Sequence, residues 1–342
     1  MSRSGDALLR AAAGIALALL LCPVVAVASG RLGGTAVNLG VGARAEAMGG
    51  AFVAIADDAS ALHWNPAGLG LVGDSRLSGT HTEWLGGVRY EWLGFVQPVR
   101  DLGSLGLGGT FLFGGNVVHT VETPAGVEER GTFAYTTKHL QVALGSKPLG
   151  RFRVGGGVEV AREGFDFSSP AAEIPAAESD ITLLHLGGLY TPPVEGLRVG
   201  AALRNVGSDA ELSGEPAPLP RLLQVGAAYE RRIESVPEEI GVEEFERTGA
   251  EVVAAPADVI TLSLDLRFMR EESPALRAGS EYRFRNGFAV RAGYRSDGPF
   301  DFASRLSGGL GYVTASYEVD YAFAPLGDLG DVHRVSFTLL FE

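Results

Sequence analysis

The chain has 342 residues, of which 46% are hydrophobic and 48 are glycine, and its formal net charge is −13. A balance this acidic argues against nucleic-acid binding, because the phosphate backbone binds basic surfaces. Beyond the N-terminal region no uncharged run is long enough to cross a membrane as a helix, so the composition favours a β-rich chain.

The first 28 residues have the pattern of a secretory signal peptide. An apolar run over residues 8–28, with Arg3 before it and Arg10 near its start, ends in the A-x-A cleavage pattern at Ala28. A lipoprotein signal at Cys22 is the alternative, and it is disfavoured because Leu21 replaces the small residue expected before a lipidated cysteine. Cleavage after Ala28 would leave the mature chain without cysteine and therefore without disulfides.

Residues 29–73 are predicted to form an N-terminal hatch or plug, because they lack the strand alternation of the later chain. Asp57 or Asp58 can cap a short helix that ends near Trp64. Asn65 precedes a proline and must leave the helical region, so we expect a tight turn after it. The residues of the plug motif are Gly42, Arg44, Ala45, Met48, Gly49, Gly50, Asp57, Asp58, Asn65, Pro66, Ala67 and Gly68.

This motif, from GARAEAMGGAFVA through DDASAL to WNPAGL, resembles the N-terminal hatch of the PorV/PorQ family. That family is similar to the wider FadL-like (OMPP1/FadL/TodX) outer-membrane transporters. A second stretch, DLGDVHRVSF at 328–337, resembles the last hairpin of the same family, whereas the middle of the chain matches in pattern only. The resemblance implies a barrel of fourteen strands around a plug. For each single plug side chain, the alternative is that it only fills space.

From Asp74 onward, apolar and polar residues alternate in segments of about 10 to 12 residues, most clearly over Ile260–Phe268. A soluble sandwich would show the same period. Segment length, aromatic residues at the ends of apolar faces and the signal peptide favour a transmembrane antiparallel β-barrel over residues 74–342. Fourteen strands are expected, at 76–86, 88–98, 103–115, 132–145, 151–165, 181–191, 197–207, 221–233, 258–269, 275–285, 288–296, 305–313, 315–324 and 332–342. A glycine pattern at 155–157 falls inside a strand, where glycine lets the wall bend or the plug approach.

An even number of strands returns both termini to one side, expected to be the periplasm. The longer connections, at 116–131, 166–180, 207–220, 296–304 and 325–331, then face outward. The inner connections are short, among them the hairpin signal Asn286-Gly287. The exception is an acidic insertion at 234–257, expected in the periplasm. It is either a solvated loop or a docking segment for a periplasmic partner.

Charged residues gather on the polar faces of the later strands, where we expect them to point into the lumen. They are Asp265, Arg267, Arg277, Glu281, Arg283, Arg285, Arg291, Arg295, Glu318 and Asp320. The favoured interpretation is that they form cross-strand pairs that hold the wall and anchor the plug, and the alternative is a selectivity surface for a ligand head group.

No catalytic, metal or cofactor site is expected, because the six histidines lie in separate segments and neither G-x-S-x-G nor H-E-x-x-H occurs. A serine and a histidine meeting in the wall, as in an outer-membrane phospholipase, is a disfavoured alternative. The resemblance to the PorV/PorQ and FadL-like families implies transport or secretion across the outer membrane of a Gram-negative cell. One form of it is FadL-like uptake of hydrophobic small molecules such as long-chain fatty acids. The other is a protein-binding component of a type IX-like secretion system, with an exported protein as partner.

Overall fold

The computed structural model describes residues 35–115, 117–124, 126–167, 178–212, 215–233, 257–297, 302–327 and 330–341. The expected signal peptide and nearly all of the acidic insertion lie outside these ranges. Within them, no helix is both long enough and apolar enough to cross a membrane.

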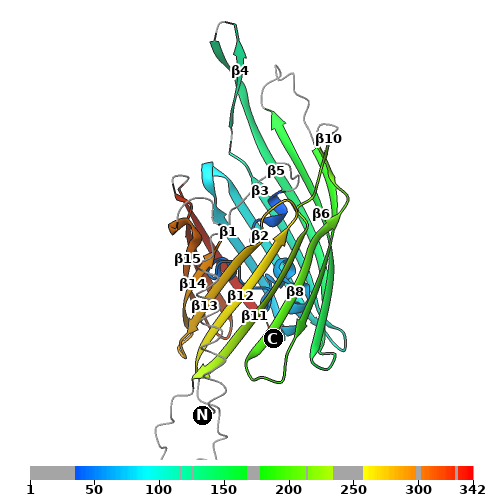
Figure 1. Cartoon of the computed structure of the whole chain (residues 1–342), viewed down its shortest axis with the longest axis vertical. Coiled ribbons are helices and arrows are strands. Elements are labelled where there is room, and N and C mark those ends of the chain that lie inside the picture. Colours follow the sequence, from blue (N-terminus) through cyan, green and yellow to red (C-terminus); the bar gives the residue numbers. More distant parts are fainter. Residues whose placement is uncertain are drawn as a thin grey trace, which may run out of the picture.

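The alternating segments form one antiparallel sheet that closes on itself (Figure 1). Its fifteen strands run in the order β3-β2-β1-β17-β16-β15-β14-β13-β12-β11-β8-β7-β6-β5-β4, and an added pairing of β3 with β5 closes the ring. Because β4 lies outside the ring, the described chain forms a transmembrane barrel of fourteen strands, which confirms the expected fold and strand count.

The observed strands differ from the expected ones by a few residues at most of their ends. In the ring they are β1 (Ser75–Glu83), β2 (Arg89–Val99), β3 (Gly103–Phe113), β5 (Gly126–Ser146), β6 (Phe152–Phe167), β7 (Glu178–Tyr190), β8 (Leu197–Gly207), β11 (Leu222–Ile233), β12 (Asp258–Met269), β13 (Ala275–Arg283), β14 (Phe288–Arg295), β15 (Leu306–Val313), β16 (Tyr317–Pro325) and β17 (Asp331–Phe341). The first and last strands pair along their whole shared length, from Ser75 opposite Phe341 to Glu83 opposite His333.

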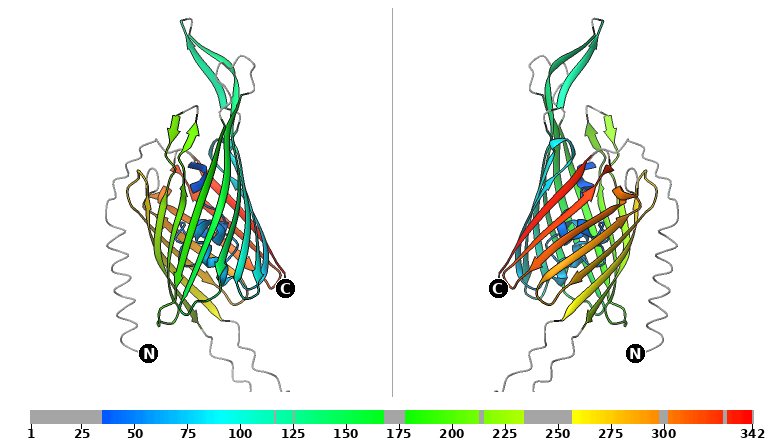
Figure 2. Two further views of the ribbon diagram at one scale, coloured as in Figure 1. Left: turned by 90° about the vertical axis from the view of Figure 1, so that its right-hand side faces the viewer. Right: turned by 90° about the vertical axis from the view of Figure 1, so that its left-hand side faces the viewer.

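Two connections that were expected to be loops contain strands. β4 (Val117–Thr123) pairs with the first part of β5, and this hairpin projects far beyond one end of the barrel (Figure 1). β9 (Ala210–Leu212) and β10 (Glu215–Ala217) form a separate two-stranded sheet at the same end (Figure 2). The sequence Val-Val-His-Thr-Val-Glu-Thr is rich in β-branched residues, which favours the strand observed within the connection expected at 116–131.

Inside the barrel lie short helical segments of residues 35–72, which we call the plug (Figure 2). They are η1 (Thr35–Asn38), α2 (Ala43–Ala47), α3 (Ala61–Trp64) and η2 (Pro66–Leu71). Two small turns lie outside the plug, η3 (Leu85–Gly87) and η4 (Ala303–Arg305). The core of the plug is apolar and almost fully shielded from solvent. It contains Met48, Phe52, Ile55, Leu62 and Trp64, each at most 2% exposed.

The local signals in the plug sequence act largely as expected. α3 ends at Trp64, and Asn65 is extended with φ −163° before the proline. The N-cap of α3 is Ser60 rather than Asp57 or Asp58 as expected, and Asp58 instead accepts hydrogen bonds from the backbone N–H and hydroxyl of Ser60. The expected tight turn at Pro66–Gly68 is wrong, because these residues begin the six-residue 3-10 helix η2. Proline at the first position suits such a helix, since its missing N–H would have no partner there.

Candidate functional site: the plug and the barrel wall

Arg44 of α2 joins the plug to the wall through a forked ion pair. Its Nε lies 2.8 Å and its Nη2 3.0 Å from the two carboxylate oxygens of Glu281 on β13. Its Nη1 lies 2.6 Å from Asp57 and 3.3 Å from Asp58, both within the plug. Burial alone would lower the pKa of Arg44, but the carboxylates of Asp57 and Glu281 raise that pKa well above its ordinary value. Arg44 therefore carries a permanent charge at the centre of the interface.

Glu281 is the hub of this network, with a side chain only 1% exposed. Besides Arg44, it accepts hydrogen bonds from Arg291 at 2.6 Å and Arg283 at 2.9 Å. Arg291 continues to Asp320 on β16 at 2.7 Å. A second ion pair crosses from plug to wall between Glu46 and Arg334 of β17. The cross-strand pairing that we expected for the lumen charges thus extends into the plug.

Asp265 holds another part of the plug without an ion pair. Its side chain is fully buried, and Oδ2 accepts hydrogen bonds from the Val53 backbone N–H at 3.0 Å and from Gln224 at 2.7 Å. Gln224 on β11 also donates to the Gly50 carbonyl at 3.0 Å. The adjacent strands β11 and β12 therefore supply hydrogen-bonding partners for the plug backbone around Gly50–Val53.

Arg267 and Arg277 converge on Asp297, at 3.1 Å and 2.8 Å, in the connection that follows β14. Glu318 lies 3.6 Å from Arg76 of β1, and Arg295 is half-buried on the inner face of β14. Arg285 does not belong with the lumen charges. β13 ends at Arg283, so Arg285 falls in the exposed turn before β14.

Asn65 binds the plug to the opposite side of the wall. Its Nδ2 donates to the Val53 carbonyl at 2.7 Å and to the Gly188 carbonyl of β7 at 3.2 Å, while Oδ1 accepts from the Ala67 N–H. The amide side chain of Asn65 thus connects the start of η2 to the central plug at Val53 and to the wall at Gly188. An aspartate here could not donate to either carbonyl.

Glycines on the inner face of the wall let the plug backbone approach closely. A Cβ on Gly155 of β6 would lie 2.3 Å from the Ala67 nitrogen, and one on Gly187 of β7 would lie 2.1 Å from Asn65 Oδ1. Across the lumen, a Cβ on Gly293 of β14 would lie 2.1 Å from the Gly49 nitrogen. Gly49 itself has φ +67°. The plug is therefore clamped between two glycine-lined parts of the wall, and the glycine pattern at 155–157 marks one of them.

We expect Gly155→Ala to destabilise the folded protein by about 1–3 kcal/mol, the usual cost of an overpacked site, because the added methyl meets plug backbone. Gly156→Ala is the matched control, since its methyl would point outward and meet nothing closer than 3.6 Å. Urea unfolding in lipid vesicles measures both free energies of unfolding. Equal values for the two variants would contradict the clamp.

The fold creates a buried cluster of two histidines and a glutamate that the spacing of these residues in the sequence does not indicate. On three neighbouring strands, His139 Nδ1 lies 2.9 Å from one carboxylate oxygen of Glu159, and His185 Nε2 lies 3.1 Å from the other. The Asn205 N–H donates to Nδ1 of His185 at 3.4 Å. The chain separates the three residues widely, and only the register of β5, β6 and β7 brings them together. Within the described ranges, no group of three or more histidine, cysteine or acidic side chains is arranged to hold a metal ion.

A small apolar cluster lies between η1 of the plug and the β9–β10 sheet. It consists of Val37, Ala161, Ile181, Leu183, Ala210 and Leu219, each at most 6% exposed, with Ala217 packed against it. By contrast, the gap between α2 and strands β1, β16 and β17 is polar. Its cavity of about 20 Å³ is lined largely by hydroxyl and acidic side chains and is large enough for about one water molecule.

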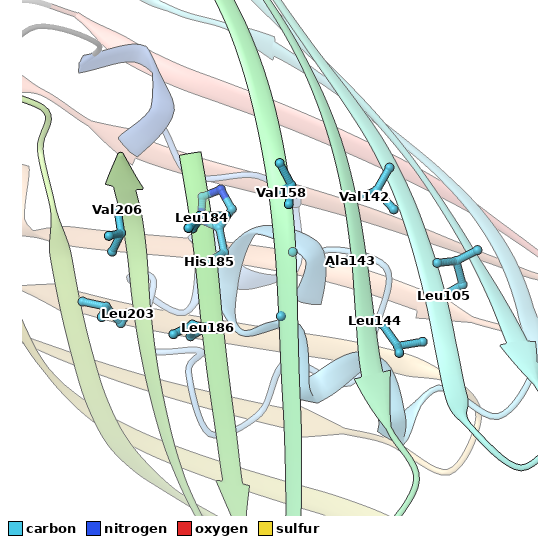
Figure 3. A pocket seen from close by; sticks show the side chains of 12 residues that line it. Leu105, Val142, Ala143, Leu144, Val158, Leu184, His185, Leu186, Leu203 and Val206 are labelled. Carbon is cyan, nitrogen blue, oxygen red and sulfur yellow. The ribbon is translucent and has the colours of Figure 1, made fainter. Parts of the chain in front are cut away.

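The larger hollows are on the outside of the barrel. One of about 450 Å³ lies over β5, β6 and β7 and is lined almost entirely by apolar side chains (Figure 3). Another of about 470 Å³ lies over β1, β2 and β17, next to His81 and Glu91. On this outer face His81 Nδ1 and a Glu91 oxygen are 2.7 Å apart.

Comparisons with known proteins agree with the barrel. The sequence pattern of the uncharacterised protein family UPF0164 matches residues 26–113, which cover the plug and the first three strands. No curated protein matches the sequence. Among solved structures, the toluene transporter TbuX of Ralstonia pickettii is similar with a TM-score of 0.58 and 16% identity, covering 89% of this chain and 100% of that one.

Two further structures have the same architecture. The monoaromatic hydrocarbon channel CymD has a TM-score of 0.58 and 15% identity, with 89% of this chain and 98% of that chain covered. A FadL homologue of Pseudomonas aeruginosa has a TM-score of 0.50 and 12% identity, over 88% and 98% of the two chains. At these identities the likeness shows a shared fold, namely that of the FadL-like barrels.

Proposed function

We propose that this protein is an outer-membrane transporter for hydrophobic small molecules, in which the plug closes the lumen. The observation that carries the proposal is a transmembrane barrel whose interior is filled by a plug with an apolar core. The similar structures are described as carriers of toluene and other monoaromatic hydrocarbons, and we extend that substrate class to this chain. Both termini then lie at the periplasmic end, and the β4–β5 hairpin and the β9–β10 sheet face outward.

The apolar cluster beneath β9 and β10 supports an entry point for such a molecule. Its members come from η1, β6, β7, β9 and the segment before β11, and none of them is charged. A hydrophobic molecule that displaces the β9–β10 sheet would replace contacts between apolar side chains with apolar contacts between itself and the cluster. Each square ångström of apolar ligand surface removed from water would contribute about 25 cal/mol.

Leu219→Asp places a charge in this cluster, so we expect it to lower uptake of radiolabelled toluene severalfold in cells that express the protein. Ser208→Asp is the control, because Ser208 lies in the same connection but is exposed. Both variants must keep the shift in gel mobility between boiled and unboiled samples that marks a folded barrel. Wild-type uptake by folded Leu219→Asp protein would reject this entry point. If cells that express the unmodified protein take up no more toluene than cells without it, the substrate class would be rejected. A long-chain fatty acid serves as the second labelled substrate.

A second function, closer to the PorV/PorQ resemblance, is favoured by the projecting hairpin. β4 is the last strand of its sheet, and residues 126–132 of β5 have no partner on the β6 side within the described chain. Unpaired strand edges can bind an extended segment of another protein by adding a strand. In this function the barrel presents the hairpin to an exported protein. Deleting residues 117–130 should then abolish partner capture and leave hydrocarbon uptake unchanged, whereas transport alone predicts no captured partner.

A further inference from the structure

A row of charged side chains crosses the outer face of the barrel on β5, β6 and β7. Lys138 lies opposite Arg162, and Arg162 lies opposite Asp180. All three are exposed, and Arg162 forms a forked pair with Asp180 at 2.7 Å and 2.9 Å. Lys138 has no ion-pair partner among the residues that the structure describes, so the β5 end of the row carries an uncompensated positive charge, whereas Arg162 is paired with Asp180 and also lies in the field of the Glu178 carboxylate on β7.

Toward the other end of these strands the same outer face is apolar. Side chains of Leu140, Val142 and Leu144 on β5 alternate with inward-facing residues, as do Val160 and Val158 on β6. Gly156 lies between Leu144 and Leu186 in the register of the three strands, and its missing side chain helps to leave the hollow of about 450 Å³ (Figure 3).

The distance between the charged row and the hollow matches one leaflet of a membrane. Arg162 and Gly156 are separated by six residues of β6, or about 20 Å at roughly 3.3 Å per residue. For a strand tilted by about 45°, this distance corresponds to a drop of about 14 Å along the membrane normal. Half of a hydrocarbon core is about 15 Å thick. A lipid with its head group at the row would therefore place the end of an acyl chain near the hollow.

We propose that the outer face of β5, β6 and β7 is a binding site for a phosphate-bearing lipid of the surrounding membrane. The phosphate binds the Lys138 ammonium and the Arg162 guanidinium, which Asp180 holds in a fixed orientation. One acyl chain lies along Val160 and Val158 and ends in the hollow at Gly156. This site is separate from the lumen and does not depend on what the barrel transports.

The test uses delipidated full-length protein in detergent, titrated with phosphatidylglycerol and followed by native mass spectrometry. Lys138→Ala should weaken binding roughly fivefold, the usual contribution of one basic residue near a lipid surface, and Lys138→Arg should restore it. Lys147→Ala is the matched control, because Lys147 is the other lysine of the chain and is exposed in the turn at the opposite end of β5. Equal loss from both lysine variants would overturn the site.

The hollow is tested separately with Gly156→Leu, which fills it. A Cβ at Gly156 meets only the His185 carbonyl and Leu186 at 3.6 Å, so the barrel can accommodate the change. Gly188→Leu adds the same side chain to the outer face where no atom lies within 4 Å of the new Cβ. We expect Gly156→Leu alone to weaken lipid binding severalfold. The proposal would be overturned by two results together: full competition of inorganic phosphate with the lipid, and wild-type lipid binding by Gly156→Leu. The site would then bind only a phosphate group at the surface.

Discussion

Deleting residues 40–68 is expected to raise the single-channel conductance of the barrel severalfold in planar bilayers. These residues include the fully buried side chains that fill the lumen, among them Phe52 and Leu62. Because all fourteen strands of the ring lie outside the deletion, the wall can still close around the space left behind. The added space is bordered by polar residues of the inner face, which water and ions can solvate.

Deletion of the projecting hairpin, residues 117–130, is the control for this experiment, because that segment lies beyond the end of the ring. It should leave the conductance at the wild-type level. Both deletion proteins must retain heat-modifiable mobility in gels before they are compared. Wild-type conductance from a folded protein that lacks residues 40–68 would show that the plug does not limit permeation.

Glu281→Ala is expected to cost about 3–5 kcal/mol of unfolding free energy, the range measured when one partner of a buried ion pair is removed. The loss leaves three guanidinium groups, those of Arg44, Arg283 and Arg291, without their shared acceptor. It also releases α2 from β13, so the same variant should make plug residues accessible to proteases.

Asp180→Ala is the matched comparison for Glu281, since Asp180 also accepts a forked hydrogen bond from an arginine but is exposed. Exposed ion pairs contribute little to stability, so we expect almost no change in unfolding free energy. Urea titration of both variants in lipid vesicles gives the two values. Similar small losses would mean that the plug network is solvated rather than buried.

Most of the wall could be predicted from the sequence because its determinant is local. In Ile260–Phe268 apolar residues alternate with polar ones, so the place of a residue in the alternation predicts which face of the wall it lies on. The observed strand β12 covers this segment. The same rule failed at β4, where a hairpin beyond the end of the ring lacks the apolar face that the pattern requires. Alternation predicts strands whose two faces have different environments, whereas both faces of an exposed hairpin are in contact with solvent.

The contacts of the plug could be predicted only in part. Arg44 was recognised in the plug and Glu281 in the lumen, but their pairing joins residues 237 positions apart and depends on how the plug is oriented. Gln224 could not be singled out, because a glutamine on the polar face of a strand has the same pattern as a solvated residue. Gly155 could be noticed as unusual in a strand, yet the Ala67 nitrogen that requires it comes from another element.

The pairing of β1 with β17 has a consequence for the order of assembly. The plug directly precedes β1, and the ring cannot close until the last strand of the chain is present to pair with the first. The wall can therefore form around the plug while the ring is still open, and no segment has to be threaded into a finished cylinder. Joining residues this far apart in the chain carries a loop-closure cost that grows only with the logarithm of the separation. The topology thus allows the final pairing step to enclose a plug that has already folded against its glycine-lined walls.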